Sequence, residues 1–294
     1  MKIRVGTRGS QLARIQAKQV TDILEEAGIE TELVVVTTKG DRNQKLPIDK
    51  IGKNGVFVGE LESVLVNGAI DIAVHSLKDM SSVLPEGFTL AAPPAAPPVW
   101  DVFVGKAPLK REEELAQMTI ATGSQRRRAE LHHFYPNILT TPIRGSIQTR
   151  IEKMRASEVD GTILAYAGLS RASLTSVISG ILDPTRFIPS PSQGLLGIEL
   201  SEARSDLLKI FEEASDPFDA FRLRIERAYQ KTLDASCRSP IGIYIERAEK
   251  DALLLHGCFA STPGEALTYA TVPSTFHTAT ADVVALAKKV KHHD

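Results

Sequence analysis

The chain has 294 residues, of which 43% are hydrophobic and 24% charged, and its formal net charge at pH 7 is -1. This composition is typical of a soluble globular protein that is long enough for two or three domains. The balanced charge gives no global attraction to nucleic acid or to an anionic membrane surface, so any recognition of anions must come from local clusters.

Neither an export signal nor a membrane span is visible in the sequence. The N-terminal segment has no apolar core of signal-peptide length, and no stretch approaches the roughly 20 apolar residues that cross a bilayer. The two cysteines, Cys237 and Cys258, are therefore expected to stay reduced rather than to pair. These features predict a cytoplasmic protein.

Strand and helix patterns alternate along the first part of the chain. Runs of β-branched and apolar residues predict strands over residues 2–7, 31–38 and 71–76. Apolar residues at helical spacing predict one helix from Ser10 to about residue 27 and another over residues 56–68. This alternation predicts a parallel sheet with helices on both faces.

A proline-rich stretch interrupts this alternation. Residues 91–101 contain four prolines and are too stiff for a flexible linker, so we interpret them as a crossover between two lobes. A second stretch rich in Pro, Ser and Gly, residues 187–194, precedes a strand over residues 195–200 that returns to the first lobe. Two crossovers predict a hinged pair of lobes that binds its ligand at the carboxyl ends of the strands.

The alternation resumes between the crossovers and changes after them. Strands are predicted over residues 101–105 and 161–169, and strand–helix pairs over residues 118–134 and 138–157. A long helix from about Asp216, two shorter strands and a final helix then predict a third domain. The predicted fold class is α/β, and the three domains are residues 1–94 with 195–213, residues 99–189, and residues 216–294.

Arginine is concentrated in the second predicted lobe, where several arginines directly follow strands. They are Arg126, Arg127, Arg128, Arg144, Arg150, Arg155 and Arg171. Arg126 and Arg127 would open a helix, so their guanidinium groups and the free backbone N–H groups could bind one anion. Arg8 could face them from the first lobe. Because no phosphate-binding loop accompanies them, we expect a carboxylate ligand, although any single arginine could instead be a solvated surface residue.

Polar side chains also follow the strand over residues 71–76. Ser76, Lys78 and Asp79 come directly after it, and the Asp79 carboxylate could stabilise a developing positive charge or transfer a proton. The alternative for Asp79 is a helix cap or an ion pair. His75 is expected to pack at the strand end, and no histidine has the spacing of a metal site.

Cys237 lies in a polar, turn-forming loop, whereas Cys258 lies in an apolar strand pattern and is expected to be an inert buried thiol. The neighbouring Arg238 would favour a Cys237 thiolate. Its residues alone leave three roles open for Cys237: a nucleophile, a redox thiol or a point of covalent attachment.

Seven motifs occur together in one order, and as a set they resemble the porphobilinogen deaminase (hydroxymethylbilane synthase) family. They are residues 5–17, 71–80, 122–131, 144–150, 163–171, 189–199 and 236–242. The resemblance implies two lobes like those of type II periplasmic binding proteins and a small C-terminal α/β domain. It also implies a transferase that joins four porphobilinogen units head to tail with loss of ammonia and releases hydroxymethylbilane by hydrolysis.

The resemblance further implies a role for each matching residue. Cys237 would carry a dipyrromethane cofactor through a thioether, and Asp79 would be the catalytic residue. The other residues that would hold the cofactor are Ser76, Lys78, Ser124, Arg126, Arg127 and Arg150. Those that would bind substrate are Arg8, Ser10, Arg144, Arg171 and Gln193. The resemblance implies porphobilinogen as the partner, no nucleic acid, no membrane, no metal, and a monomer.

The sequence also departs from the family pattern. Gly59, Ala96, Trp100, Gly123, Gln125 and Ser192 stand where the family has other residues. We expect Trp100 to pack in the hinge and residues 42–58 to form a mobile lid. The alternatives are a non-catalytic two-lobed protein that binds a polycarboxylate, a cysteine-nucleophile transferase or hydrolase, and a degenerate paralogue. A non-catalytic protein would leave Cys237 and Asp79 without a role.

Overall fold

The structure is a computed structural model that describes residues 2–37, 59–235 and 239–292. Two features predicted from the sequence, the thioether anchor Cys237 and the lid over residues 42–58, lie outside these described residues.

The chain divides into two compact units. The first comprises Met1–Ala96 and Gly194–Leu223, and the second comprises Pro97–Gln193 and Arg224–Asp294. The second unit contains two separate sheets, which belong to the predicted second and third domains. The division of the chain into three domains stays a prediction.

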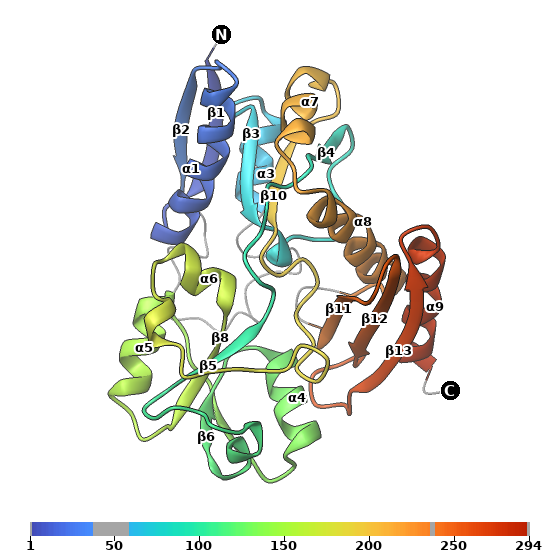
Figure 1. The fold of residues 1–294 in the computed structure, drawn as a ribbon. Helices are drawn as coiled ribbons and strands as arrows, with labels where there is room; N and C mark the ends of the chain where they lie inside the picture. The colour runs from blue at the N-terminus through green and yellow to red at the C-terminus, as the bar shows by residue number, and fades with distance from the viewer. Residues whose placement is uncertain (1, 38–58, 236–238, 293–294) are drawn as a thin grey trace. The chain divides into compact units, whose positions relative to one another are not determined.

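The first unit contains a five-stranded sheet of order β2-β1-β3-β10-β4 (Figure 1). Its strands are β1 (Ile3–Arg8), β2 (Thr31–Val36), β3 (Ile72–Ser76), β4 (Phe88–Leu90) and β10 (Leu196–Ser201). The first three strands are parallel, as predicted, but β10 runs antiparallel to both β3 and β4. The predicted all-parallel sheet is therefore wrong, because β10 enters beside the end of β3, where Leu196 pairs with Ser76.

Helices cover both faces of this sheet, as the strand–helix alternation predicted. They are α1 (Gln11–Glu26), α3 (Gly59–Val66) and α7 (Ser205–Glu213). On one face, α1 and α7 pack on apolar strand residues that include Val74 and Ile198. On the other face, Leu61 and Leu65 of α3 pack on Ala73. Neighbouring strand residues thus serve opposite faces, as the two-residue period of a strand requires.

The second unit contains a five-stranded sheet of order β7-β6-β8-β5-β9. Its strands are β5 (Asp101–Gly105), β6 (Thr119–Ala121), β7 (Leu139–Thr141), β8 (Gly161–Ala165) and β9 (Gly180–Ile181). Strands β6, β7 and β8 are parallel, and β5 is antiparallel to β8 and β9. Both large sheets therefore have three parallel strands followed by an antiparallel strand. This arrangement confirms the predicted α/β class.

The helices of this sheet are α4 (Gln125–Phe134), α5 (Ile147–Arg155) and the short α6 (Tyr166–Arg171), with 3₁₀ turns at Glu112–Gln117 and Thr175–Val177. Helices α4 and α5 begin at side-chain caps that the sequence supplies. The Ser124 hydroxyl accepts from Arg127 N, and Ser146 serves α5 in the same way. Trp100 packs edge-to-face on Tyr166 of α6, with ring centroids 5.6 Å apart. Residues 161–169, predicted as one strand, thus divide into β8 and α6.

The third sheet is antiparallel and has the order β11-β12-β13. Its elements are α8 (Pro217–Thr232), β11 (Ile241–Arg247), β12 (Ala252–Phe259), β13 (Thr268–Thr275) and α9 (Ala279–His292). The sequence predicted all of them except β13. Helix α9 lies along β12 and β13 (Figure 1). Cys258 of β12 is buried in a cluster with Ile188, against which Ala129 of α4 packs, so this sheet is attached to α4.

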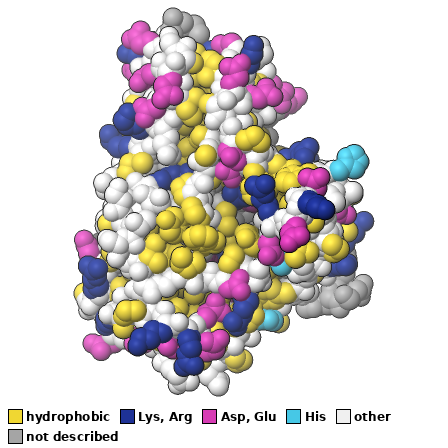
Figure 2. Space-filling model, in the orientation of Figure 1, with side chains coloured by type: hydrophobic (Ala, Val, Ile, Leu, Met, Phe, Trp, Pro, Cys, Tyr) yellow, Lys and Arg dark blue, Asp and Glu magenta, His cyan; other side chains and the backbone are white. Residues whose placement is uncertain are grey.

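The surface carries no dominant charge on the face shown in Figure 2, where acidic and basic side chains are interspersed. This agrees with the balance of 35 basic and 36 acidic residues. Among the described helices, none is both long and apolar enough to span a bilayer.

Candidate functional site

A pocket of about 120 Å³ opens in the first unit, where β1 and β3 end. Its lining is Arg8, Ser10, Leu12, Ala13, Gln16, Val74, His75, Ser76 and Asp79. Four of the residues predicted from sequence, Arg8, Ser10, Ser76 and Asp79, therefore line one pocket. Their convergence follows from the topology, because β1 and β3 are adjacent and parallel and so end at the same edge.

Local hydrogen bonds hold the polar groups of this pocket. The Ser10 hydroxyl caps α1 by accepting from Ala13 N at 3.2 Å. The Ser76 hydroxyl and the Gln16 side-chain amide bond each other, with distances of 3.0 Å to Nε2 and 3.1 Å to Oε1. After Ser76 the chain forms a 3₁₀ turn, Leu77–Asp79, whose last residue is exposed.

The chemistry of this pocket is that of an acid beside anion-binding groups. The exposed Asp79 carboxylate can accept an N–H and stabilise positive charge next to it. The Arg8 guanidinium and the Ser10 hydroxyl can bind a carboxylate. Lys78, half-buried in the same turn, adds a second cation near Asp79.

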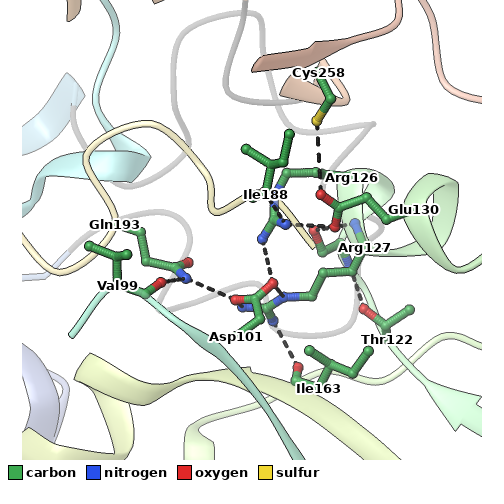
Figure 3. Close-up of polar contacts among 11 residues, drawn as sticks. Val99, Asp101, Thr122, Arg126, Arg127, Glu130, Ile163, Ile188, Gln193 and Cys258 are labelled. Atoms are coloured by element: carbon green, nitrogen blue, oxygen red, sulfur yellow. Dashed lines mark hydrogen bonds and ion pairs between the residues drawn. The ribbon is translucent and has the colours of Figure 1, made fainter. Parts of the chain in front are cut away.

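A second group of predicted residues lies in the other unit, around Asp101 (Figure 3). Asp101 is fully buried and accepts four hydrogen bonds from three side chains. Arg126 donates through Nη2 at 2.7 Å, and Arg127 donates through Nε at 2.9 Å and Nη2 at 2.8 Å. Gln193 donates through Nε2 at 2.8 Å. Burial acts to raise the pKa of Asp101, but the two guanidinium charges outweigh it and hold that pKa well below the usual range.

The buried cluster extends from Arg126 to the third sheet. Arg126 Nη1 donates to Glu130 Oε2 and to the Ile188 carbonyl, each at 2.7 Å. Burial raises the pKa of Glu130 to about 8 even though Arg126 opposes the shift. The Cys258 thiol donates to Glu130 Oε1 across 3.8 Å, and burial raises the pKa of this thiol. Cys258 is therefore the inert buried thiol that the sequence predicted.

The remaining predicted residues of the second unit lie at helix ends. Ser124 caps α4, and Arg171 is the last residue of α6. Arg150 of α5 donates from Nε to the Gly145 carbonyl at 2.8 Å, and Arg144 is half-buried just before that helix. Gln193, predicted to bind substrate, also donates to the Val99 carbonyl at 2.7 Å. The functional roles of these residues stay predictions.

Sequence reasoning missed three members of these groups. Asp101 was given no role from the sequence, although it is the centre of the arginine cluster. Glu130 and Gln16 lay inside recognised motifs but were given no role. Within the described residues no three His, Cys, Asp or Glu side chains come together in a group that could hold a metal ion.

Of two glycines that depart from the family pattern, Gly123 has a structural reason and Gly59 has none among the described residues. A Cβ atom at Gly123 would lie 2.8 Å from the Ile143 carbonyl oxygen, so this backbone favours glycine. Around Gly59, the first residue of α3, a Cβ atom would meet nothing within 4 Å, so nothing described there excludes a longer side chain.

The pocket of the first unit fits a dipyrromethane on chemical grounds. Each of its two pyrrole rings carries an acetate, a propionate and a ring N–H. Ser76 and the neighbouring Lys78 supply donors for the carboxylates, and Asp79 supplies an acceptor for the ring N–H. The thioether position, Cys237, lies outside the described residues.

Comparisons with known proteins identify the family. A family model described as "Porphobilinogen deaminase, dipyromethane cofactor binding domain" matches residues 3–209. The porphobilinogen deaminase of Desulfosudis oleivorans is 40% identical over 268 residues, which cover 90% of this chain and 86% of that protein. The enzyme of Bacillus subtilis is 36% identical over 273 residues, 92% of this chain and 87% of that protein.

Among solved structures, the L-cystine solute receptor of Neisseria gonorrhoeae in its unliganded open conformation matches 78% of this chain and 91% of its own. Its TM-score is 0.45 and its identity is 13%. The family rests instead on the sequence matches, which extend over about nine-tenths of the chain, and on the family model, whose span of residues 3–209 includes the pocket residues Arg8, Ser76 and Asp79. The chain therefore belongs to the porphobilinogen deaminase family.

Proposed function

We propose that this chain polymerises porphobilinogen with Asp79 as its catalytic residue. The observation that carries the proposal is the pocket that places the exposed Asp79 carboxylate beside Arg8, Ser10 and Ser76. The family is one of deaminating transferases, and the pocket supplies the two things such a reaction needs. These are an anion to stabilise a cationic pyrrole and donors to bind the carboxylates of the substrate.

The reaction breaks one C–N bond and forms one C–C bond for each unit added. Ammonia leaves from the aminomethyl group as the pyrrole nitrogen supplies its electron pair, so positive charge develops on that nitrogen. The α-carbon of the growing chain then attacks the methylene carbon and afterwards loses its proton. Asp79 stabilises the charge on the pyrrole nitrogen in both steps, and Arg8 and Ser10 hold the incoming ring by its carboxylates.

When bound, the dipyrromethane cofactor supplies the free α-carbon that accepts the first unit. We assign its binding to Ser76 and Lys78 of the first unit and to four residues of the second, Ser124, Arg126, Arg127 and Arg150. Arg144, Arg171 and Gln193 are assigned to substrate. Asp101 supports this assignment because it fixes both Arg126 and Arg127 at one point.

The charge of the buried cluster supports the same assignment. Two guanidinium groups face one Asp101 carboxylate, and the pKa of about 8 keeps Glu130 largely protonated at neutral pH. The cluster therefore retains one net positive charge. This charge suits a chain of pyrroles that gains two carboxylates with each added unit.

We further propose a cytoplasmic monomer with three domains, residues 1–94 with 195–213, 99–189 and 216–294. The free, buried thiol of Cys258 suits a reducing compartment. The separate β11-β12-β13 sheet supports a distinct C-terminal domain. Light scattering on a sizing column tests the monomer directly, because the measured molar mass should be 32.0 kDa for a monomer and twice that value for a dimer.

The intact mass of the purified protein tests the anchor. The wild type should carry an added mass equal to two linked pyrrole units, and Cys237→Ser should lack it. Cys258→Ala is the matched control, because it removes the other thiol and should keep the adduct. An adduct that survives in Cys237→Ser, or that is lost in Cys258→Ala alone, contradicts the assignment.

Incubation with porphobilinogen separates the proposed enzyme from its alternatives. Release of ammonia with stepwise gains in mass and then release of a linear tetrapyrrole supports the deaminase. Binding without ammonia release indicates a non-catalytic binding protein. An adduct that forms but never turns over indicates a degenerate paralogue.

A further inference from the structure

A histidine and a glutamate form a buried pair directly behind the Asp79 turn. His75 is the residue before Ser76 on β3, and Glu199 lies on the neighbouring strand β10. The two side chains are 3% and 0% exposed, and His75 Nε2 lies 3.3 Å from Glu199 Oε2. His75 therefore packs at the strand end, as the sequence predicted, but it does so against a carboxylate.

This pair is poorly satisfied by its surroundings. Within the described residues, neither His75 Nε2 nor either oxygen of Glu199 makes a hydrogen bond of acceptable geometry. A buried carboxylate without donors is costly, and buried charged pairs are weak sources of stability. The contribution of this pair to stability therefore does not explain why it is kept, and a functional role is the better explanation.

A second His–Glu pair in the molecule shows what an ordinary one looks like. On the third sheet, His256 Nε2 lies 2.9 Å from Glu246 Oε2, and the other ring nitrogen bonds Thr271 at 3.0 Å. The Glu246 side chain is 39% exposed. That pair is hydrogen-bonded and reaches water, whereas the pair behind the Asp79 turn has neither advantage.

The Glu199 carboxylate also affects the pKa of a third titratable group, Glu62 of α3. Burial, together with the negative charge of Glu199, raises the pKa of Glu62 to about 7. Two carboxyl groups are therefore held near each other on the α3 face of the sheet. His75 is the residue whose ring nitrogen lies within ion-pair distance of Glu199, at 3.3 Å.

The strand that carries Glu199 also supports the turn that carries Asp79. His75 pairs with Gly197, so Glu199 is its diagonal neighbour across the strands. A Cβ atom at Gly197 would lie 2.7 Å from Met80 Sδ and 3.3 Å from His75 Cβ. The missing side chain lets the turn pack closely on β10 and leaves Glu199 free to reach His75.

Leu77 N donates to the Leu195 carbonyl at 3.2 Å, and this backbone hydrogen bond attaches the turn to the residue before β10. Met80 N donates to the Leu77 carbonyl at 3.0 Å and so closes the turn itself. Asp79 lies between these two donors. Residues 195–199 thus form a support beneath the catalytic turn, and the His75–Glu199 contact is its side-chain part.

We propose that Glu199 is a positioning residue, which acts through His75 to fix the end of β3 and thereby the place of the Asp79 carboxylate in the pocket. The proposal rests on the proposed function, because it assigns Glu199 to the reaction that Asp79 serves. It also explains why a carboxylate without a hydrogen bond among the described residues is kept on an inner strand of the sheet.

Steady-state kinetics with porphobilinogen test the role. Glu199→Gln keeps the shape of the side chain and removes its charge. We expect kcat to fall about tenfold per folded molecule while KM changes less than about twofold. A kcat within about twofold of the wild type, or a loss confined to KM, would overturn the proposal. The folded fraction is measured by denaturant titration, so a loss of stability alone cannot imitate this result.

A double-mutant cycle tests whether the two residues act as one. His75→Gln should lower kcat as much as Glu199→Gln, and the double variant should lose no more than either single one, about tenfold. Losses that multiply to about a hundredfold would show independent roles and overturn the pair. Should Glu199→Gln fail to fold, His75→Gln carries the kinetic test on its own.

Amide hydrogen exchange gives a readout that does not depend on activity. Glu199→Gln should speed exchange at Leu77 N and Met80 N, whereas Glu246→Gln, the matched control on the third sheet, should change neither these amides nor kcat. Unchanged exchange at both amides contradicts the proposal. A wild type without turnover would overturn the proposed function, and faster exchange in the variant would still show that Glu199 positions the turn.

Discussion

Two aspartates near strand ends have opposite surroundings in the two units. Asp79, in the turn after β3, is exposed in a pocket, whereas Asp101, the first residue of β5, is fully buried and bonded by three side chains. A strand-end carboxylate is therefore available to a ligand where it is exposed, and is not available where buried side chains already donate hydrogen bonds to it. Asp101 organises two arginines, and Asp79 remains accessible to a ligand.

The largest effect is expected from Asp101→Asn. This change leaves two buried guanidinium groups facing a neutral amide, and removing one partner of a buried ionic network costs about 3–5 kcal/mol of unfolding free energy. Denaturant titration measures the loss. Asp206→Asn is the control, because the Asp206 side chain pairs with Arg204 but is 61% exposed, and its loss should cost at most about 1 kcal/mol. Equal losses in both variants would remove the contrast between buried and exposed carboxylates.

Asp79→Asn should show the reverse pattern. The variant keeps its size but loses the charge that stabilises the pyrrole cation, so we expect kcat to fall about 100-fold. The unfolding free energy should change by no more than about 0.5 kcal/mol, because Asp79 is exposed. Glu86→Gln, at an exposed carboxylate shortly after the turn, should leave kcat unchanged. An active Asp79→Asn enzyme would contradict the catalytic assignment.

The contrast also explains what the sequence could and could not predict. Strands and helices with regular apolar spacing, such as β1 and α1, were predicted correctly because their pattern is local. Asp79 was found because the end of β3 and the turn after it are adjacent in sequence. The role of Asp101 depends on Arg126 and Gln193, 25 and 92 residues away, so only the assembled sheet reveals it.

Strand β13, helix α6 and the antiparallel direction of β10 were not predicted from the sequence, and each omission has a physical reason. Strand β13 contains Pro273 and lies at an edge of its sheet, where proline is tolerated but weakens the strand pattern. Helix α6 follows β8 without a capping side chain, so no local signal marks its start at Tyr166. The antiparallel direction of β10 depends on where the second crossover returns, which residue spacing does not encode.

Glu130→Gln tests the second carboxyl group of the buried cluster. Glu130 has a pKa of about 8 in the folded protein and about 4.3 when unfolded, so between these values the folded state holds one more proton. The stability of the wild type should therefore fall as the pH rises from about 4.5 to 8, by roughly 1.4 kcal/mol for each pH unit. Glutamine does not titrate, so the variant should lack this slope. Stability curves that run parallel for the two proteins would show that Glu130 is ionised throughout.

The smallest effect, and the one with the opposite sign, is expected from Ser192→Gly. Ser192, one of the departures from the family pattern, is 1% exposed and has a φ of 62°, in the left-handed region that favours glycine. Its backbone N–H donates to Glu226, but its hydroxyl has no hydrogen-bond partner among the described residues. Removing about 1–2 kcal/mol of backbone strain and an unsatisfied hydroxyl outweighs the extra chain entropy of glycine, about 0.5–1 kcal/mol.

We therefore expect Ser192→Gly to raise the unfolding free energy by about 1 kcal/mol, measured by denaturant titration. Ser192→Ala is the matched control, because it removes the hydroxyl but keeps the strain and should gain less. Ser192 immediately precedes Gln193, which donates to Asp101, so this strain is stored beside the buried cluster. A glycine variant that is less stable than the wild type would show that the serine side chain supports the Asp101 cluster rather than straining the backbone beside it.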